Sequence, residues 1–388
     1  MTLPSVQFVQ STRKLSEAMA DRNTAFVFDE WYVAGYTDEF ARDLFKRTLL
    51  GRNLVFFRTE AGKLVALDDR CAHRSYPLSL GTLDGDTLIC GYHGLRYDER
   101  GDLIEIPSQE RCPKGVGVRA YALKEIGPLV WIWMGEPAAA DESKIPALPW
   151  VTSPEWVHSK GYMHLEGNYV SFHENLLDLT HLSYIHAKSF GTPDYAHAPF
   201  DVVIKDNYFA LERRVVPTKL PPIWAQSTGL GESRTAARIA QSEFLAPGVH
   251  ETTVAFYDTA LPESERPTFY VKGAHLPTPE TQGSTHYFVL DGRSFALDQE
   301  WITKFMHEQL AVVFQEDVVA LADLEKNLER ADENTFEISI ASDRPSVEMR
   351  KFLKQRAEGR KPNVPVTVRH INMPRPASRE AAPAAESV

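Results

Sequence analysis

Two cysteines and two histidines form the first constellation in this sequence that could do chemistry. Cys71 and His73 stand in C-A-H-R, and Cys90 and His93 stand in C-G-Y-H-G, with 16 residues between His73 and Cys90. Thiolates and imidazoles at this spacing suit either a tetrahedral zinc site or an iron–sulfur cluster. Because C-x2-C dominates in zinc knuckles, the C-x-H spacing favours the cluster and leaves zinc as the alternative.

A second constellation lies in the segment E-N-L-L-D-L-T-H-L-S-Y-I-H. Asn175, Asp178 and His181 are three residues apart, so they share one face of a helix. His186 follows five residues later and would point about 140° away from His181 on a regular helix. Both imidazoles can reach one metal only if the helix ends or bulges between them. The alternative is a buried stripe of hydrogen-bonded polar residues, which is unfavourable to bury without a partner.

A carboxylate is needed to complete a two-histidine site that leaves positions open for dioxygen. A long amphipathic helix is predicted from about residue 299 to 330, with Asp298 as its cap. Its apolar stripe consists of Leu310, Phe314, Leu321, Leu324 and Leu328. Asp317 takes the missing place in this stripe, whereas Glu316 falls on a more polar face. A carboxylate among apolar side chains is unfavourable unless it binds a cation, so Asp317 is the predicted third ligand. A surface Asp on a misphased stripe is the alternative.

The segments around these residues show two different patterns of predicted secondary structure. Short β-rich runs punctuated by Gly and Asp surround the first constellation and predict a small all-β domain. Helical and strand-like segments alternate around the second constellation. The predicted organisation is an N-terminal extension (1–28), the β domain (29–140), a catalytic domain (141–361) and a Pro/Ala-rich tail that is extended or disordered (362–388).

Composition excludes several classes of function. The 388 residues carry 42 basic and 53 acidic side chains, a net charge of -11, which argues against nucleic-acid binding. Three cysteines cannot build a disulfide framework, and Cys112 matches no ligand position. The N-terminus lacks the apolar core of a signal peptide, and the longest uncharged apolar stretch is far short of the ~20 residues that span a bilayer. A cytoplasmic protein that does not bind membranes is expected.

The two motifs together resemble a known family. C-x-H-x16-C-x2-H, followed by IPS and PLVWIWMGEP, resembles the Rieske domain of Rieske non-haem iron oxygenases, nearest the vanillate and dicamba O-demethylase branch. N-x2-D-x2-H-x4-H, followed by QEDVV, is similar to that family's mononuclear iron motif. The resemblance extends from about residue 30 to 330. One departure is Gly94-Leu95, where the family commonly has Gly-Trp, and it bears on packing or reductase docking near the cluster.

The resemblance implies two cofactors and their ligands. In a Rieske [2Fe-2S] cluster the thiolates hold one iron and the imidazoles hold the other, which raises the reduction potential. The implied cluster ligands are Cys71, His73, Cys90 and His93. The implied ligands of the mononuclear Fe(II) are His181, His186 and Asp317. The implied fold is α+β, an all-β Rieske domain plus a catalytic domain whose antiparallel sheet is flanked by helices in a helix-grip arrangement.

Two further residues receive catalytic roles from the resemblance. Asp178 would bridge a Rieske histidine of one subunit to His181 of its neighbour in a head-to-tail homotrimer. Asn175 would lie near the iron without being a firm ligand.

The implied function is that of the terminal oxygenase in a multicomponent monooxygenase of aromatic catabolism. Such an enzyme uses O2 and reductase-delivered electrons to oxidise a small aromatic substrate, by O-demethylation or by methyl or ring hydroxylation. The chain has no G-x-G-x-x-G after a strand, so NAD(P)H and flavin should bind to the separate reductase, with or without a ferredoxin domain. The alternatives are a dioxygenase of the same family, and a Rieske electron carrier without oxygen chemistry.

The substrate pocket is expected between about residues 190 and 298, although its residues are not identified. Candidate segments surround Trp224, Arg234 to Arg238 and His250, whose cationic members could pair with a substrate carboxylate. The remaining histidines, such as His275, are interpreted as ordinary hydrogen-bonded residues.

Overall fold

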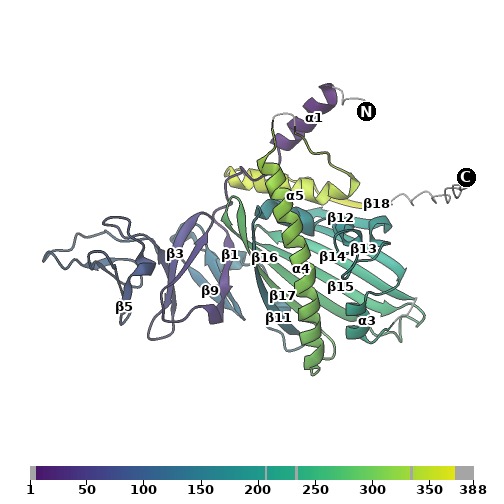
Figure 1. Ribbon diagram of the computed structural model, residues 1–388, viewed down its shortest axis with the longest axis horizontal. Coiled ribbons are helices and arrows are strands. Elements are labelled where there is room, and N and C mark those ends of the chain that lie inside the picture. Colours follow the sequence, from purple (N-terminus) through teal and green to yellow (C-terminus); the bar gives the residue numbers. More distant parts are fainter. Residues whose placement is uncertain (1–5, 206–207, 232–234, 333–334, 372–388) are drawn as a thin grey trace, which may run out of the picture.

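The computed structural model describes residues 6–205, 208–231, 235–332 and 335–371, and its sheets follow one another along the long axis (Figure 1). Three small antiparallel sheets come first. They contain β1 (Trp31–Tyr36), β10 (Leu129–Trp133) and β9 (Leu123–Ile126), then β2 (Phe45–Leu49), β3 (Arg52–Arg58) and β4 (Leu64–Asp68), and finally β5 (Thr82–Asp84), β6 (Thr87–Ile89), β7 (Arg96–Tyr97) and β8 (Leu103–Glu105).

One eight-stranded antiparallel sheet forms the larger, catalytic part. In spatial order its strands are β11 (Val157–Leu165), β17 (Ser284–Arg293), β16 (Phe269–Thr281), β15 (Val249–Asp258), β14 (Ala236–Ala246), β13 (Tyr208–Thr218), β12 (Phe200–Lys205) and β18 (Thr367–Ile371). Neighbours in this order are antiparallel throughout. The predicted α+β class is confirmed.

Helices cover one face of the large sheet, and the longest, α4, runs across its strands (Figure 1). The helices are α1 (Val6–Glu17), α2 (Tyr169–Leu176), α3 (Pro222–Thr228), α4 (Glu300–Glu329) and α5 (Arg344–Ala357). Short 3-10 turns are η1 (Thr37–Glu39), η2 (Leu78–Leu80), η3 (Pro137–Ala139), η4 (Glu142–Lys144), η5 (Pro149–Val151), η6 (Leu179–Ser183), η7 (Tyr195–His197) and η8 (Ala341–Asp343). Within the described residues, no helix combines the length and the apolar character needed to cross a membrane.

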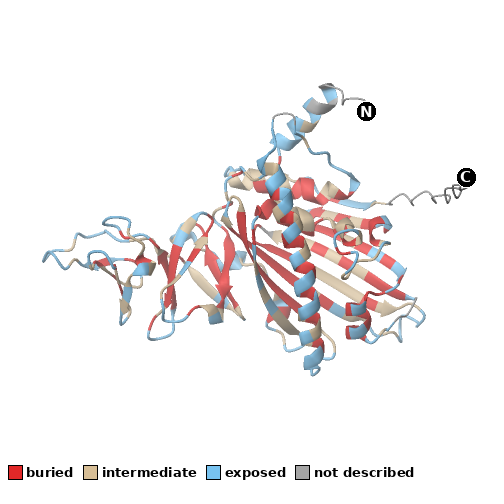
Figure 2. Ribbon diagram, viewed as in Figure 1, coloured by how far each residue is buried: buried red, intermediate tan, exposed pale blue. Residues whose placement is uncertain are grey.

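Strand β17 joins the two parts because both of its faces are buried. Tyr287 and Val289 pack in the cluster beneath α4, while Phe288 and Leu290 pack against Trp131 and its neighbours in the β1–β10–β9 sheet. Side chains alternate between the faces of a strand, so a continuous apolar run can serve two cores at once. Figure 2 shows this buried centre and the exposed loops at the β5 end.

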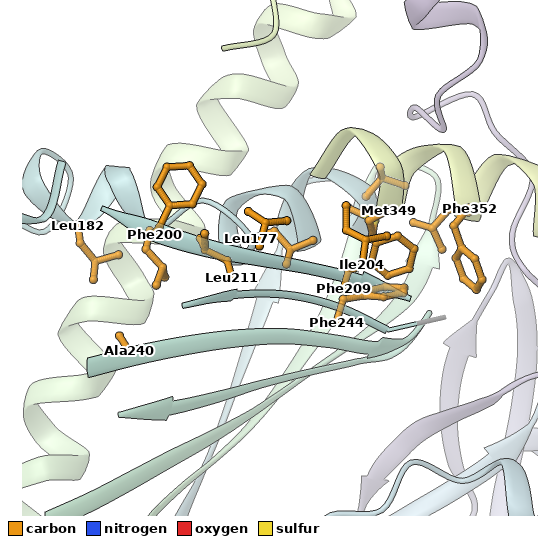
Figure 3. Packing of buried hydrophobic residues seen from close by; sticks show 14 of the residues in the cluster. Leu177, Leu182, Phe200, Ile204, Phe209, Leu211, Ala240, Phe244, Met349 and Phe352 are labelled. Atoms are coloured by element: carbon orange, nitrogen blue, oxygen red, sulfur yellow. The ribbon is translucent and has the colours of Figure 1, made fainter. Parts of the chain in front are cut away.

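The edge of the large sheet is held by α5. Figure 3 shows Phe352 and Met349 of this helix against Phe209 and Phe244 of β13 and β14. The Phe352 ring lies 5.5 Å from that of Phe209 and 6.0 Å from that of Phe244, in edge-on contacts. This cluster fixes the end of the sheet beside α2 and η6, which carry the second constellation.

The long helix matches its predicted range but differs in two details. The residue before α4 is Gln299, whose side chain makes no capping hydrogen bond, so the predicted cap at Asp298 is wrong. Leu324, predicted to belong to the apolar stripe, is exposed, whereas Glu325 is buried and forms an ion pair with Arg22. The stripe drifts around the helix because 3.6 residues per turn do not match its spacing.

Both end segments of the chain contain regular secondary structure. In the N-terminal extension, helix α1 precedes Ala20 and Val27, which are buried in the same cluster as α5. In the tail, which was predicted to be extended or disordered, Thr367–Ile371 are extended and form β18, which pairs with β12. Residues 372–388 of the predicted tail lie outside the described residues.

Replacing Phe352 by Ala should destabilise the catalytic part by about 3–5 kcal/mol, because the change removes a fully packed ring and leaves a cavity. Urea unfolding followed by fluorescence measures this loss. The matched change Val366→Ala, at a side chain that is 69% exposed, should alter stability by no more than about 0.5 kcal/mol. Equal effects of the two changes would contradict the assigned core.

Candidate metal centres and substrate pocket

The first four candidate ligands lie on two loops with matching geometry. The amide of Ser75 donates to the carbonyl of Cys71, and the amide of Gly94 donates to that of Cys90, each at 3.0 Å. Ser75 and Gly94 both have positive φ, 57° and 72°, which turns each loop back towards its strand. Two equivalent loops therefore present one cysteine and one histidine each.

The loops divide their donors into a buried pair and an exposed pair. Cys71 and Cys90 are both 2% exposed, while His73 and His93 are exposed and their Nδ1 atoms lie 3.1 Å apart. The hydroxyl of Tyr97 lies 3.1 Å from Cys71 Sγ. This set fits a two-iron cluster with sulfur ligands inside and imidazole ligands outside. Sequence reasoning missed Tyr97, which carries no motif signal.

Electrostatics at the cysteine pair also suit a cationic occupant. Burial is the main cause that raises the pKa of Cys90, and the neighbouring Cys71 thiol adds to it. Backbone amides of Tyr92 and His93 act in the opposite direction. A thiol with a raised pKa, such as that of Cys90, is deprotonated when it binds a metal ion. Cys112, by contrast, donates its thiol to the carbonyl of Leu103, consistent with an ordinary structural residue.

The second constellation is built where a helix ends. Helix α2 stops at Leu176, and η6 then runs from Leu179 to Ser183. Asp178 begins this turn, with its side chain accepting from the amide of Thr180 at 2.9 Å. The turn ends at Ser183, between His181 and His186, which fulfils the condition set by their five-residue spacing. The prediction that Asn175, Asp178 and His181 share one helix face is wrong, because α2 ends before Asp178. The rings of His181 and His186 lie 5.1 Å apart between centroids.

Asp317 of α4 meets the two histidines. Its Oδ1 lies 3.1 Å from His186 Nε2 and 3.8 Å from His181 Nε2. One donor atom from each of the three residues lies within 4.8 Å of the other two. Asn175 Nδ2 donates to the same Asp317 oxygen at 3.1 Å, so this residue lies beside the group without belonging to it. The arrangement can hold one metal ion on one side and leave the other side open.

Outer hydrogen bonds orient both imidazoles. His181 Nδ1 donates to the backbone carbonyl of Asp178, and His186 Nδ1 donates to Glu316 at 2.8 Å. Ser189 also donates to Glu316, at 2.6 Å. Because a carbonyl and a carboxylate only accept, each Nδ1 carries a proton, and each Nε2 can bind a metal ion once it is deprotonated. Glu316, rejected as a ligand from its place on the helix, thus has an orienting role that sequence reasoning missed.

The protonation balance follows from burial and pairing. Burial is the largest influence on His181 and lowers its pKa. Burial alone would lower the pKa of His186, but hydrogen bonds to Asp317 and Glu316 outweigh it and raise that pKa. Burial would likewise raise the pKa of Asp317, yet its contacts with His186 and His181 lower it. An ionised Asp317 beside imidazole nitrogens is a donor set of the kind that iron binds.

A largely apolar cavity of about 80 Å³ adjoins these three residues. The volume is well below the about 150 Å³ of a core cavity that accommodates benzene, so even one ring requires side chains to move. The cavity is lined by α4, η6 and strands β14 to β17, with Phe190, Trp224, Val254, Leu310 and Phe314 among its apolar members. Such a site excludes water from the open side of the triad.

The structure separates the predicted pocket residues. Trp224 and Arg238 line the cavity, whereas His250 is fully buried behind it and bonded to Ser242. Arg234 lies outside the described residues. His275, predicted to be an ordinary buried histidine, forms part of the cavity wall. The alternation of side chains along a strand could not predict which of these residues line the cavity, because it does not indicate which face of the strand packs against α4.

Comparisons with known proteins place this geometry in a family. Residues 165–359 match the vanillate O-demethylase oxygenase C-terminal domain, and residues 30–122 match the Rieske [2Fe-2S] domain. The chain belongs to the Rieske non-haem iron oxygenases of the vanillate O-demethylase type.

Individual relatives agree with this assignment. The iron–sulfur subunit of the toluene-4-sulfonate monooxygenase system of Comamonas testosteroni is 34% identical over 82% of this chain and 93% of its own. The vanillate O-demethylase oxygenase subunit of Pseudomonas sp. strain HR199 is 30% identical over 78% of this chain and 87% of its own. The crystal structure of dicamba monooxygenase bound to 3,6-dichlorosalicylic acid superposes with a TM-score of 0.80, at 26% identity, over 86% of this chain and 98% of its own.

Family membership confirms several predictions. The oxygenase carries a Rieske [2Fe-2S] cluster and a mononuclear non-haem iron, and it is a monooxygenase-type component that depends on a reductase for electrons. The match to a catalytic domain argues against a pure electron carrier, and the Rieske match favours the cluster over zinc.

Replacing Glu316 by Gln should weaken binding of the mononuclear iron by roughly 10–100-fold, because the amide no longer fixes His186 as a carboxylate does. Anaerobic Fe(II) titration of apoprotein measures the affinity, and the visible spectrum of the Rieske cluster should not change. Glu308→Gln, on the exposed side of the same helix, is the matched control. An unchanged iron affinity in Glu316→Gln would contradict the orienting role.

Proposed function

We propose that this oxygenase hydroxylates a small aromatic substrate, most simply at a methyl group on oxygen or on the ring. The observation that carries this proposal is the convergence of His181, His186 and Asp317 on a largely apolar cavity in a chain of this family. The proposal takes its substrate class from the relatives, whose names specify vanillate, dicamba and toluene-4-sulfonate. Hydroxylation of an O-methyl group would release formaldehyde, and ring or methyl hydroxylation would not.

The proposed roles of the residues follow from the geometry. Cys71 and Cys90 with the two histidines of the loops would hold the cluster, and His181, His186 and Asp317 would hold the iron. When bound, the cluster supplies single electrons and the iron supplies dioxygen activation. Asn175 keeps Asp317 in place by its hydrogen bond. The apolar side chains of the cavity keep bulk water away from the reacting carbon.

We further propose that electrons cross between subunits of a homotrimer. Within one chain the β5–β8 sheet, which lies beside the cluster loops, is separated from the large sheet by two other sheets (Figure 1). Asp178 lies at a surface hollow together with His181 and Ile338, and its side chain is 26% exposed. Exposed apolar residues line this hollow, including Ile338 at 62% and Ile185 at 38%. A partner subunit's cluster loops would cover that surface and bring an exposed histidine to Asp178.

We also propose the domain boundaries 29–140 and 141–361 for the Rieske and catalytic domains. Both family matches fall inside these ranges. The N-terminal segment packs against the catalytic domain, because Ala20 and Val27 are buried in the core of that domain.

The function is tested by reductase-dependent oxygen consumption with a panel of methoxy- and methyl-substituted aromatics, together with formaldehyde release. Asp317→Ala should abolish both and lower the iron content from about three to about two per chain, with the cluster spectrum intact. Oxygen consumption that persists in Asp317→Ala would contradict the assigned iron site. Consumption that no aromatic stimulates would contradict the proposed substrate class.

Asp178→Asn should retain all the iron, because Asp178 lies outside the metal-binding triad, yet reduce turnover at least about 100-fold by removing the bridging carboxylate. Rapid mixing after reduction of the cluster measures electron transfer to the iron directly. Asp201→Asn, at an exposed ion pair with His370, is the matched control. Rapid electron transfer in Asp178→Asn would contradict the bridge.

A further inference from the structure

Three arginines are almost fully buried in the large sheet. Arg213, Arg238 and Arg293 are 0%, 1% and 2% exposed. A guanidinium carries five N–H donors and a permanent charge, so burying one without partners is strongly unfavourable. The hydrogen bonds of each guanidinium therefore indicate whether the arginine has a structural role or could bind a ligand.

Two of them make three hydrogen bonds each within the protein, although the Nε of each has no partner. Arg213 donates to two backbone carbonyls and to the Thr180 hydroxyl, and it lies 4.0 Å from Asp178. Arg293 donates to two backbone carbonyls and to the Thr303 hydroxyl. Both side chains tie loops and helices to the sheet, which is a structural role.

Arg238 is different. Among the described residues its guanidinium makes one short hydrogen bond, from Nη1 to the carbonyl of Phe190 at 2.8 Å, whereas each of the other two makes three. The Tyr195 side chain also favours the charged form of Arg238. Among the residues that the structure describes, no carboxylate lies within 4.0 Å of it. Its guanidinium instead lies 4.7 Å, 5.0 Å and 5.8 Å from the ring centroids of Tyr195, Phe190 and Trp224. The charge is thus enclosed by aromatic rings, and burial lowers its pKa.

No other group of the cavity balances this charge. Asp291 lines the cavity, but burial raises its pKa to about 8, so it is mostly uncharged at neutral pH. Burial lowers the pKa of His275 to about 4, so this ring is neutral too. Asp317 faces His181 and His186. Arg238 therefore supplies the pocket with a guanidinium that no charged carboxylate of the pocket pairs with, although Asp194, outside the pocket, favours its charged form.

We propose that Arg238 is the anion anchor of the substrate site, and that the substrate is an aromatic ring bearing a carboxylate or sulfonate. The oxyanion would bind the unpaired N–H groups of the guanidinium, while the ring packs among Phe190, Trp224 and the neighbouring apolar side chains. Binding at one end would direct the opposite end of the ring towards Asp317 and the histidines. This inference rests on the proposed function, since it names the substrate class of the same site.

Arg238 also has a structural contact that the test must separate from recognition. The hydrogen bond from Arg238 to the Phe190 carbonyl fixes the loop that follows His186. The rings of Phe190 and His186 lie 5.0 Å apart between centroids. A variant could therefore lose binding because the loop moves. Pairs of ligands that match in shape and differ only in charge distinguish these causes.

The experiment measures equilibrium binding to the iron-loaded, oxidised holoenzyme by calorimetry. The ligand pairs are toluene-4-sulfonate with its neutral sulfonamide, and 4-methylbenzoate with its neutral amide. Wild type should bind at least one anion about tenfold or more tightly than the matched amide. Arg238→Gln should lose about tenfold or more for that anion and little for the amide, and Arg238→Lys should restore part of the preference. Arg293→Gln, a buried arginine outside the cavity, should lower the melting temperature and leave the preference unchanged.

The outcomes are distinct. Equal binding of anion and amide by wild type, or no binding of either anion, would overturn the proposal. An equal loss for anion and amide in Arg238→Gln, with iron content intact, would show a structural role only and would also overturn it. If Arg238→Gln does not fold, the comparison of wild type with Arg238→Lys decides. Arg238-dependent binding of an anion without reductase-driven oxygen consumption would support the anchor while contradicting the proposed reaction.

Discussion

The catalytic half of the molecule depends on one buried carboxylate, Asp317, in the packed face of a long helix. A negative charge in that position is tolerable only with partners, and His181, His186 and Asn175 provide them from segments about 130 to 140 residues away in the sequence. The same helix contributes Glu316 to orient His186. One element thus supplies both a candidate ligand and the group that fixes another ligand, so the position of α4 on the sheet controls the whole site.

The two candidate metal centres face opposite environments, and this matches their chemistry. His73 and His93 are exposed at the tip of the Rieske part, where an electron donor or acceptor can approach closely. His181, His186 and Asp317 line a largely apolar cavity, whose side chains limit the access of water to the site. Strand β17 joins the two parts rigidly because each face packs into a different core. The proposed contact between subunits would connect the exposed centre of one chain to the buried centre of another.

Charge within the cavity is controlled by burial more than by composition. The chain as a whole is acidic, with a net charge of -11, yet the substrate cavity contains a guanidinium that no charged carboxylate of the cavity pairs with. Burial keeps Asp291 mostly protonated and His275 neutral, so neither offsets Arg238. An anionic aromatic ligand would be repelled by the surface on average but stabilised inside. Selectivity for such a ligand thus arises locally, from one side chain enclosed by three aromatic rings.

Short-range spacing determined much of this protein from the sequence alone. The two Cys/His motifs follow from the spacing of their residues, and the preference for Asp317 over Glu316 follows from the periodicity of one helix. Periodicity failed for Asn175, Asp178 and His181, which do not share one helix, because α2 ends at Leu176 and His181 lies in η6. Tertiary structure decided the outward turn of Leu324, the strand formed by residues 367–371, the orienting role of Glu316, and the placement of Arg238 in the cavity with His250 behind it. These features depend on which faces of distant elements pack together, and the free energy of that packing is not encoded in the spacing of neighbouring residues.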